Sequence, residues 1–166
     1  MTDATARLAL PFIASGQAQK ELFHNEALVR IDALLQPAVE SLLVDSPPPA
    51  PAPGQCWIVG ESPVGAWAGQ ALALAAWSDG GWRFVSPRPG MAVWSLADTL
   101  VAHFDGDAWM VGEIRARRLL VDGVAVVGAQ QSAIADPTGG TSQDSEARAA
   151  ISAILAALRS HGLIAS

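Results

Sequence analysis

Apolar residues recur every three or four positions from Gln17 to about Leu43, with charged residues between them. This period puts the apolar side chains on one face of an α-helix, so the pattern predicts an amphipathic helix. Pro37 lies inside the pattern and should end or kink the helix, because proline has no backbone N–H to donate. The apolar positions are Ala18, Leu22, Phe23, Ala27, Ile31, Leu34, Leu35, Val39 and Leu42, and the polar side is marked by Glu26, Arg30 and Glu40.

Residues 1–16 are partly apolar but lack the helical period, and Pro11 discourages a helix there. An apolar, extended segment ahead of a well-formed helix is typical of an attachment arm. We therefore expect residues 7–15 to bind another protein rather than to join the core, so that a chain starting at Gln17 would still fold. The side chains expected to make this contact are Leu10, Phe12 and Ile13.

From residue 55 to residue 130 the pattern changes to short apolar runs separated by Gly, Pro and Asp, which is typical of antiparallel strands. Asp-Gly pairs lie between several runs, and Asp-Gly supplies the positive φ angles that tight hairpin turns need. The pairs are Asp79-Gly80, Asp105-Gly106 and Asp122-Gly123. The sequence thus predicts an antiparallel meander, a small barrel or a sandwich. With a helix towards each end of the chain, the predicted fold is mainly β in the α+β class.

A proline-rich stretch, residues 46–54, connects the first helix to the predicted strands. Polyproline geometry would make it a stiff linker, but a loop wrapped over the domain surface would have the same composition, so both interpretations stay open. The predicted organisation has four segments. They are an arm with a helix (1–45), the connector (46–54), a tryptophan-rich β domain (55–130) and a loop with a second helix (131–166).

The second helix follows a loop that contains Pro137 and Gly139-Gly140. Its apolar stripe is narrow and flanked by alanine, which suits close packing against another helix, including one from a second subunit. Packing on the protein's own sheet explains the stripe equally well. The stripe residues proposed for a subunit interface are Ile151, Leu155 and Leu158.

The composition indicates that the protein surface carries few charged side chains. Of the 166 residues, 51% are apolar and only 16% are charged, and Lys20 is the one lysine. Because a small domain has a large surface to keep soluble, this shortage indicates that partners cover part of it. We therefore expect a homo-oligomer or a larger assembly.

Charge and hydropathy also argue against two classes of partner. The formal net charge of −6 argues against nucleic-acid binding, which needs clustered Lys and Arg. No run approaches the roughly 20 apolar residues of a membrane span, and the first residues lack the basic start and apolar core of a signal peptide. We expect neither a nucleic acid nor a membrane as partner, and synthesis in a reducing cytoplasm.

Residues that would carry catalysis are not arranged in any recognisable motif. His24, His103 and His161 lie in different predicted elements, and Cys56 is the single cysteine. Walker loops, dinucleotide fingerprints, nucleophile elbows and paired-histidine metal motifs do not occur. The sequence therefore predicts a protein that is not an enzyme and that has no catalytic residues, no cofactor and no metal.

Tryptophan is the remaining chemical signal, since all six tryptophans fall in the predicted β domain. Aromatic faces bind sugar rings, so we consider Trp77, Trp82 and Trp109, which flank two of the Asp-Gly turns, as glycan-binding candidates. Tryptophan is also favoured on strands because it buries a large area. Packing in a core or an interface is the simpler explanation for each of them.

Three stretches carry a resemblance to a known family. They are "LALPFIASGQAQKELFHNEALVRIDALLQPAV" (8–39), the later "GQCWIVG" (54–60) with "AAWSDGGWRFVSPRPGMAVW" (75–94), and the closing "VVGAQQSAIADPTGGTSQDSEARAAISAILAALRSHGLI" (126–164). Together they resemble an uncharacterised domain family of alphaproteobacterial prophages and gene transfer agents. The resemblance spans nearly the whole chain, and its "GQAQKE…HNEAL…DAL" part is quite specific.

The resemblance implies a structural part of a virion, similar to the base of a head spike that sits on capsid vertices and carries a receptor-binding fibre. Expected partners are capsid or other virion proteins, a spike or tail fibre, and further copies of the chain, with a pentamer favoured and a trimer second. Assembly would take place in the bacterial cytoplasm, with release by lysis. The alternative is a carbohydrate-binding module that recognises host capsule polysaccharide.

Overall fold

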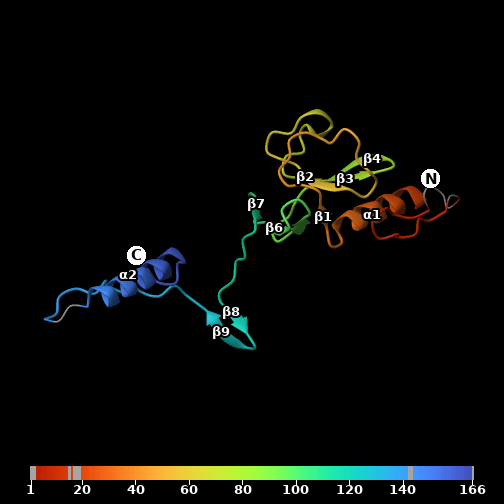
Figure 1. Cartoon of the computed structure of the whole chain (residues 1–166). Coiled ribbons are helices and arrows are strands. Elements are labelled where there is room, and N and C mark those ends of the chain that lie inside the picture. Colours follow the sequence, from red (N-terminus) through yellow and green to blue (C-terminus); the bar gives the residue numbers. More distant parts are fainter. Residues whose placement is uncertain (1–2, 15, 17–19, 142–143, 166) are drawn as a thin grey trace. The chain divides into compact units, whose positions relative to one another are not determined.

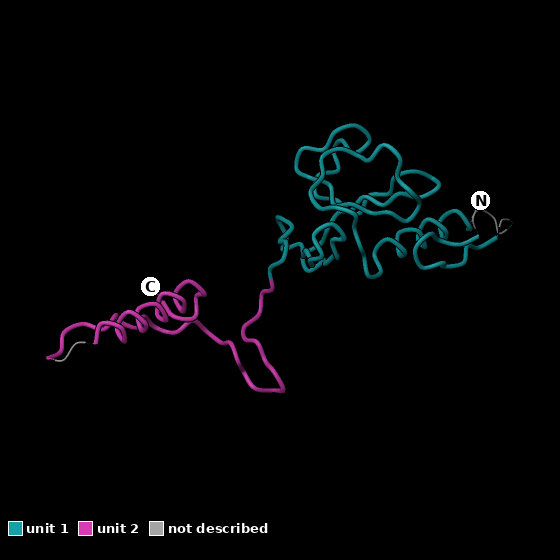
Figure 2. Tube along the Cα trace, viewed as in Figure 1, with its two compact units in different colours: residues 1–113 teal, residues 114–166 magenta. Residues whose placement is uncertain are grey.

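The computed structural model describes residues 3–14, 16, 20–141 and 144–165. The chain divides into two compact units, residues 1–113 and 114–166, which are coloured separately in Figure 2. The described residues form mainly antiparallel sheets and two α-helices, so the predicted α+β class is confirmed. The division follows Glu113, inside the segment that the sequence pattern presented as one β domain.

Helix α1 (Lys20–Leu34) is shorter than the sequence pattern predicted. The prediction that it continues to Leu43 is wrong, because the helix ends three residues before Pro37 and Gln36 takes a positive φ of 46°. Beyond the proline the chain becomes strand β1 (Ala38–Val39), which pairs in parallel with β5 (Ala92–Ser95). Val39 is therefore a buried strand residue instead of a helix residue.

The prediction of which face of α1 is buried is also wrong in part. Leu22 and Phe23 are 64% and 79% exposed, whereas Asp32 is buried. The reason lies in the N-terminal arm, which runs beside α1 in Figure 1 and hydrogen-bonds to Asn25 and Asp32. The arm covers the side of the helix that carries Asn25 and Asp32, and much of the apolar side stays open.

Two small sheets form the rest of the first unit. One has the strand order β1-β5-β6-β7 and the other the order β2-β3-β4, with every pair antiparallel except β1 with β5. A short 3₁₀ turn, Gly65–Trp67, lies between β2 and β3. The remaining bounds are β2 Cys56–Ile58, β3 Leu74–Ser78, β4 Gly81–Val85, β6 Leu100–Phe104 and β7 Trp109–Val111.

Strand β2 of the three-stranded sheet is buried on both faces, whereas β4 is half-buried throughout. Cys56 and Ile58 join one apolar cluster with Val93 and Phe104 of the four-stranded sheet, so this cluster lies between the two sheets. Trp57 joins a second cluster that consists largely of tryptophans. The sheet thus separates an aliphatic core from an aromatic one.

Both ends of the proline-rich segment 46–54 are tied to the three-stranded sheet. Val44 N–H donates to Ile58 C=O at 3.1 Å, and Gly54 N–H donates to Trp77 C=O at 2.9 Å. Of the two interpretations of this segment, these bonds support a loop that returns to the domain it left.

The second unit contains a two-stranded hairpin and a helix. Strands β8 (Leu119–Val121) and β9 (Val124–Val127) are antiparallel, and helix α2 (Ser145–Ser160) follows after a long loop. The N-cap of the helix is Asp144, whose side chain accepts a hydrogen bond from Ala147 N–H at 2.9 Å. Gly162, with φ of 70°, lies just beyond its end.

Candidate functional site

Trp77 and Trp82 face each other across the β3–β4 hairpin, with ring centroids 4.9 Å apart and ring planes at 66°. Trp82 also contacts Trp57 and Trp67, at centroid distances of 5.5 and 5.1 Å, and stacks on Phe84. An indole with four aromatic neighbours has little free face to offer a sugar ring. The structure therefore brings two of the three glycan candidates together, but in an aromatic cluster in which they pack on each other.

Trp109 lies apart from this pair. It belongs to the aliphatic core, is only 5% exposed, and contacts Phe104 with ring centroids 5.5 Å apart. Its indole Nε1–H donates to Leu72 C=O at 2.9 Å, so its polar group is satisfied inside the protein. Burial and this hydrogen bond give Trp109 a role in packing.

Trp94, which the sequence analysis did not select, is the exposed tryptophan among the described residues, at 43%. Along β5 the buried Val93 and Ser95 alternate with the exposed Ala92 and Trp94, so Trp94 points to the outer face of the four-stranded sheet. Its cross-strand partner there is Val101, also exposed. The sequence gives no signal for this, because the polar Ser95 is buried on β5 whereas the apolar Trp94 is exposed.

The outer face around Trp94 can be followed across the sheet by its register. Val101 on β6 lies opposite Trp94, and His103, which follows on the same face of β6, lies opposite Met110 of β7. Both His103 and Met110 are half-buried. This surface, the Trp94 face, is an aromatic and aliphatic patch with one imidazole, and it can bind another apolar surface or stack against a ring.

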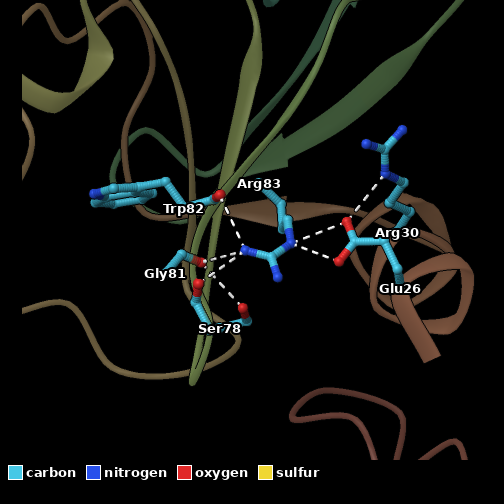
Figure 3. A network of polar contacts seen from close by, with 7 residues as sticks. Glu26, Arg30, Ser78, Gly81, Trp82 and Arg83 are labelled. Carbon is cyan, nitrogen blue, oxygen red and sulfur yellow. Dashed lines mark hydrogen bonds and ion pairs between the residues drawn. The ribbon is translucent and has the colours of Figure 1, made fainter. Parts of the chain in front are cut away.

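Figure 3 shows the polar contact between α1 and the β3–β4 hairpin. Arg83 Nε–H donates to both carboxylate oxygens of Glu26, at 2.9 and 2.8 Å, and Arg83 Nη1 donates to the carbonyl oxygen of Gly80. Arg30, one helical turn after Glu26, makes a longer contact of 3.3 Å. This network holds α1 against the hairpin that carries Trp77 and Trp82, so it fixes the position of these two elements.

Residues 24–110 match the protein family described as "Protein of unknown function (DUF2793)". The chain belongs to the DUF2793 family. The match covers just over half of the chain, from α1 to β7, and thus contains the aromatic cluster, the Trp94 face and the Glu26–Arg83 contact. No curated protein matches the chain.

The arm, which precedes the DUF2793 segment, is bound to α1 through Asp32. One carboxylate oxygen of Asp32 accepts from Thr5 Oγ1 at 2.8 Å and from Leu8 N–H at 2.7 Å, and the other accepts from Arg7 N–H at 2.9 Å. The Arg7 guanidinium then donates to carbonyls at the end of α1, those of Asp32, Leu35 and Gln36. The arm therefore caps the helix.

The attachment candidates of the arm are all half-buried in the first unit. Ile13 is held by paired bonds with Asn25, whose side chain accepts from Ile13 N–H at 2.9 Å and donates to its carbonyl at 3.2 Å. Leu10 C=O accepts from Thr5 N–H at 3.0 Å, and Phe12 N–H donates to Asp3 C=O at 2.8 Å. A folded loop therefore presents these three side chains, and each keeps part of its surface available.

Helix α2, which follows the DUF2793 segment, divides the other three candidates. Leu155 is 6% exposed, Leu158 is half-buried and Ile151 is 45% exposed. Arg148 and Arg159, three turns apart, donate to the carbonyls of Pro137 and Ile134, so the preceding loop runs along one side of α2. Leu155 packs within the unit, and Ile151 remains available to a partner.

The titratable groups of the described residues do not converge. No group of three or more His, Cys, Asp or Glu side chains among them could hold a metal ion. Burial raises the pKa of the Cys56 thiol to about 11, so this thiol is protonated at neutral pH and is a poor nucleophile. None of the described helices is long and apolar enough to cross a membrane.

Proposed function

We propose that this DUF2793 protein is a structural, self-associating component of a phage or gene transfer agent virion, a head-spike base or adaptor that attaches a receptor-binding fibre to the capsid. Its partners are then capsid or other virion proteins, a spike or tail fibre and further copies of the chain. The resemblance of the arm and the tail to virion proteins of prophages and gene transfer agents supports the choice of particle.

One observation carries the structural role: the second unit buries few of its own apolar residues, Leu155 and Ile164 among those described. Every residue of β8 and β9 is exposed, and of the sixteen residues of α2 only Leu155 is buried. A lone two-stranded hairpin is marginally stable in water, and large exposed apolar patches mark protein contacts. A unit of this kind is completed by neighbouring subunits.

The first unit offers further contact surfaces of the same kind. The open side of α1 exposes Phe23 and Ile31, and the Trp94 face exposes Trp94 and Val101. Several separate apolar surfaces on one small protein suit a subunit with several neighbours, as in a particle, better than a protein with a single ligand. On a capsid vertex we expect a pentamer, with a trimer second, because a closed ring takes the symmetry of its site.

The proposal is tested on particles purified from a culture that produces them. We expect the chain to copurify with the particles through a density gradient, and a deletion of its coding sequence to leave capsids that lack the spike. Absence of the chain from purified particles, when it is present in the cell lysate, would contradict the proposal.

A second candidate function, binding of host capsule polysaccharide, is favoured by the exposure of Trp94. A tryptophan face that lies open on a sheet can stack against a pyranose ring, and His103 on the same face supplies a polar group. A capsule pull-down with Trp94→Ala, compared with Trp77→Ala, tests this function. Loss of binding in the first variant alone would support it, and wild-type protein that binds no glycan would exclude it.

A further inference from the structure

The β8–β9 hairpin has two strands, and each has an outer edge that pairs with no other strand in the described part of the chain. Its large side chains are exposed on both faces of this small sheet: Leu119, Leu120, Val121, Val124, Val126 and Val127. Unpaired edges of apolar strands are templates for pairing with another chain. The charges at the two ends of β8 indicate which chain pairs with this hairpin.

Strand β8 is flanked by opposite charges at matching distances from its centre. Arg118 precedes Leu119, Asp122 follows Val121, and Leu120 lies midway between the two charges. Among the described residues, neither Arg118 nor Asp122 makes an ion pair or a side-chain hydrogen bond. Read in the reverse direction, the segment has the complementary charge order, so two copies match when they run antiparallel.

We propose that β8 pairs edge to edge with β8 of a second copy of this chain, antiparallel and with a two-fold axis at Leu120. The inference rests on the self-association proposed above and names one of its contacts. In this register Leu119 lies opposite Val121 of the second copy, and each Arg118 lies opposite an Asp122. The product is a four-stranded antiparallel sheet, which is stable where the single hairpin is marginal.

The charges also distinguish this contact from a ring of hairpins that all point the same way. In such a ring β8 of each copy would lie beside β9 of the next copy, so the exposed Arg117 and Arg118 of all copies would gather at one end of the ring and the Asp122 carboxylates at the other, with no opposite charge directly across from either. Like charges placed side by side on strands are destabilising, whereas opposite charges directly across stabilise the pair. The two-fold pair is thus a contact of the free protein, separate from the symmetry that a vertex imposes.

The geometry makes a direct cross-linking test possible in the full chain. Two residues directly opposite each other in an antiparallel pair have Cα atoms about 4.5–5.5 Å apart, within the range of a disulfide. We therefore expect Leu120→Cys to form a covalent dimer under mild oxidation. The native Cys56 is buried and does not compete.

The matched control is Val126→Cys, which is similarly exposed but lies on β9. In the four-stranded sheet the two copies of residue 126 are separated by roughly three strand spacings of about 4.8 Å, too far for a disulfide. A dimer from Leu120→Cys alone supports the pairing. Dimers from both variants, or from neither, overturn it.

A charge exchange tests the register. Arg118→Glu or Asp122→Lys alone places like charges opposite each other twice, and we expect each to raise the dimer dissociation constant by roughly tenfold or more. The double variant restores the opposite charges and should recover the dimer. Asp122→Asn, which keeps the turn preference, should weaken the dimer without changing the hairpin. If the double variant associates no better than the single ones, Arg118 and Asp122 do not pair.

These outcomes are separable from the proposed function. A chain that copurifies with particles but gives no cross-link through residue 120 retains the virion role and loses the hairpin contact. A chain that cross-links through residue 120 but is absent from particles retains the hairpin contact and loses the virion role.

Discussion

Arg83 on β4 holds Glu26 on α1 through one Nε–H that lies 2.9 and 2.8 Å from the two carboxylate oxygens, across 57 positions of sequence. Both side chains are partly exposed, at 26% and 36%, so water weakens the attraction. The contact nevertheless fixes where α1 lies on the sheet, because Arg83 is itself held by the carbonyl of Gly80.

We expect Arg83→Ala and Glu26→Gln each to lower the free energy of unfolding by about 1 kcal/mol, the upper end for a partly exposed pair with good geometry. The double variant should cost less than the sum of the two, which a double-mutant cycle from urea denaturation measures. Arg30→Ala is the control, because its contact with Glu26 is longer and more exposed and should contribute only about 0.3–0.5 kcal/mol. Additive effects of Arg83→Ala and Glu26→Gln would show that the contact contributes no stability.

Asp32 leads to a second prediction, one that revises the expected behaviour of the arm. Its buried carboxylate accepts hydrogen bonds from Thr5, Arg7 and Leu8, so a chain that starts at Gln17 would leave it without them. We expect that truncation, like Asp32→Ala, to lower the free energy of unfolding by on the order of 3 kcal/mol and to lower the Tm.

Calorimetry on the truncated chain and on Asp32→Ala measures these losses. Glu61→Ala, at an exposed position of a loop, is the control and should change the Tm little. If the truncated chain melts like the full chain, the arm does not stabilise α1, and the original expectation of a separable attachment arm is correct.

The local features of the fold could be predicted from the sequence. Each of the three Asp-Gly pairs lies between two consecutive strands, and α1 ends before Pro37. Both features depend on only a few neighbouring residues, because a turn needs particular backbone angles and proline lacks a backbone N–H to donate. The extra length predicted for α1 failed because tertiary pairing of Ala38 and Val39 with β5 overrode the helical period.

Faces were harder to predict than elements. The helical period of α1 predicted that its apolar stripe is buried. The side that carries Asp32 is buried instead, because three donors from the arm hydrogen-bond to its carboxylate. Likewise a tryptophan's position in the sequence does not show which sheet covers it. Trp109 is enclosed between two sheets and Trp94 is not, and only the register of β5 with β6 separates them.

Cys56 leads to a prediction on pH. The pKa of its thiol is raised from 9.0 to about 11 chiefly by burial, so the unfolded chain ionises first as the pH rises. Stability is therefore unaffected by this group below pH 9 and falls between pH 9 and 11, by on the order of 2 kcal/mol at pH 11. The chain has no tyrosine and a single lysine, so few other side chains titrate in this range.

Urea denaturation followed by tryptophan fluorescence at a series of alkaline pH values measures this loss. Cys56→Ala should lower the stability at pH 8, because it leaves a small cavity in the aliphatic core, and should flatten the dependence above pH 9. An equally steep loss in Cys56→Ala would assign the alkaline effect to another group.

The last prediction separates the two roles that α2 plays. Leu155 is buried within the second unit, so Leu155→Asp should unfold α2, because an unpaired buried carboxylate costs several kcal/mol. Ile151 is exposed, so Ile151→Asp should leave the helix intact, by circular dichroism, and lower the molar mass of any oligomer held by this stripe, by light scattering. Ala153→Asp, at an exposed position on another side of α2, is the control and should change neither quantity. An unchanged molar mass for Ile151→Asp would show that the stripe contacts no second copy, and self-association would then depend on the other apolar surfaces.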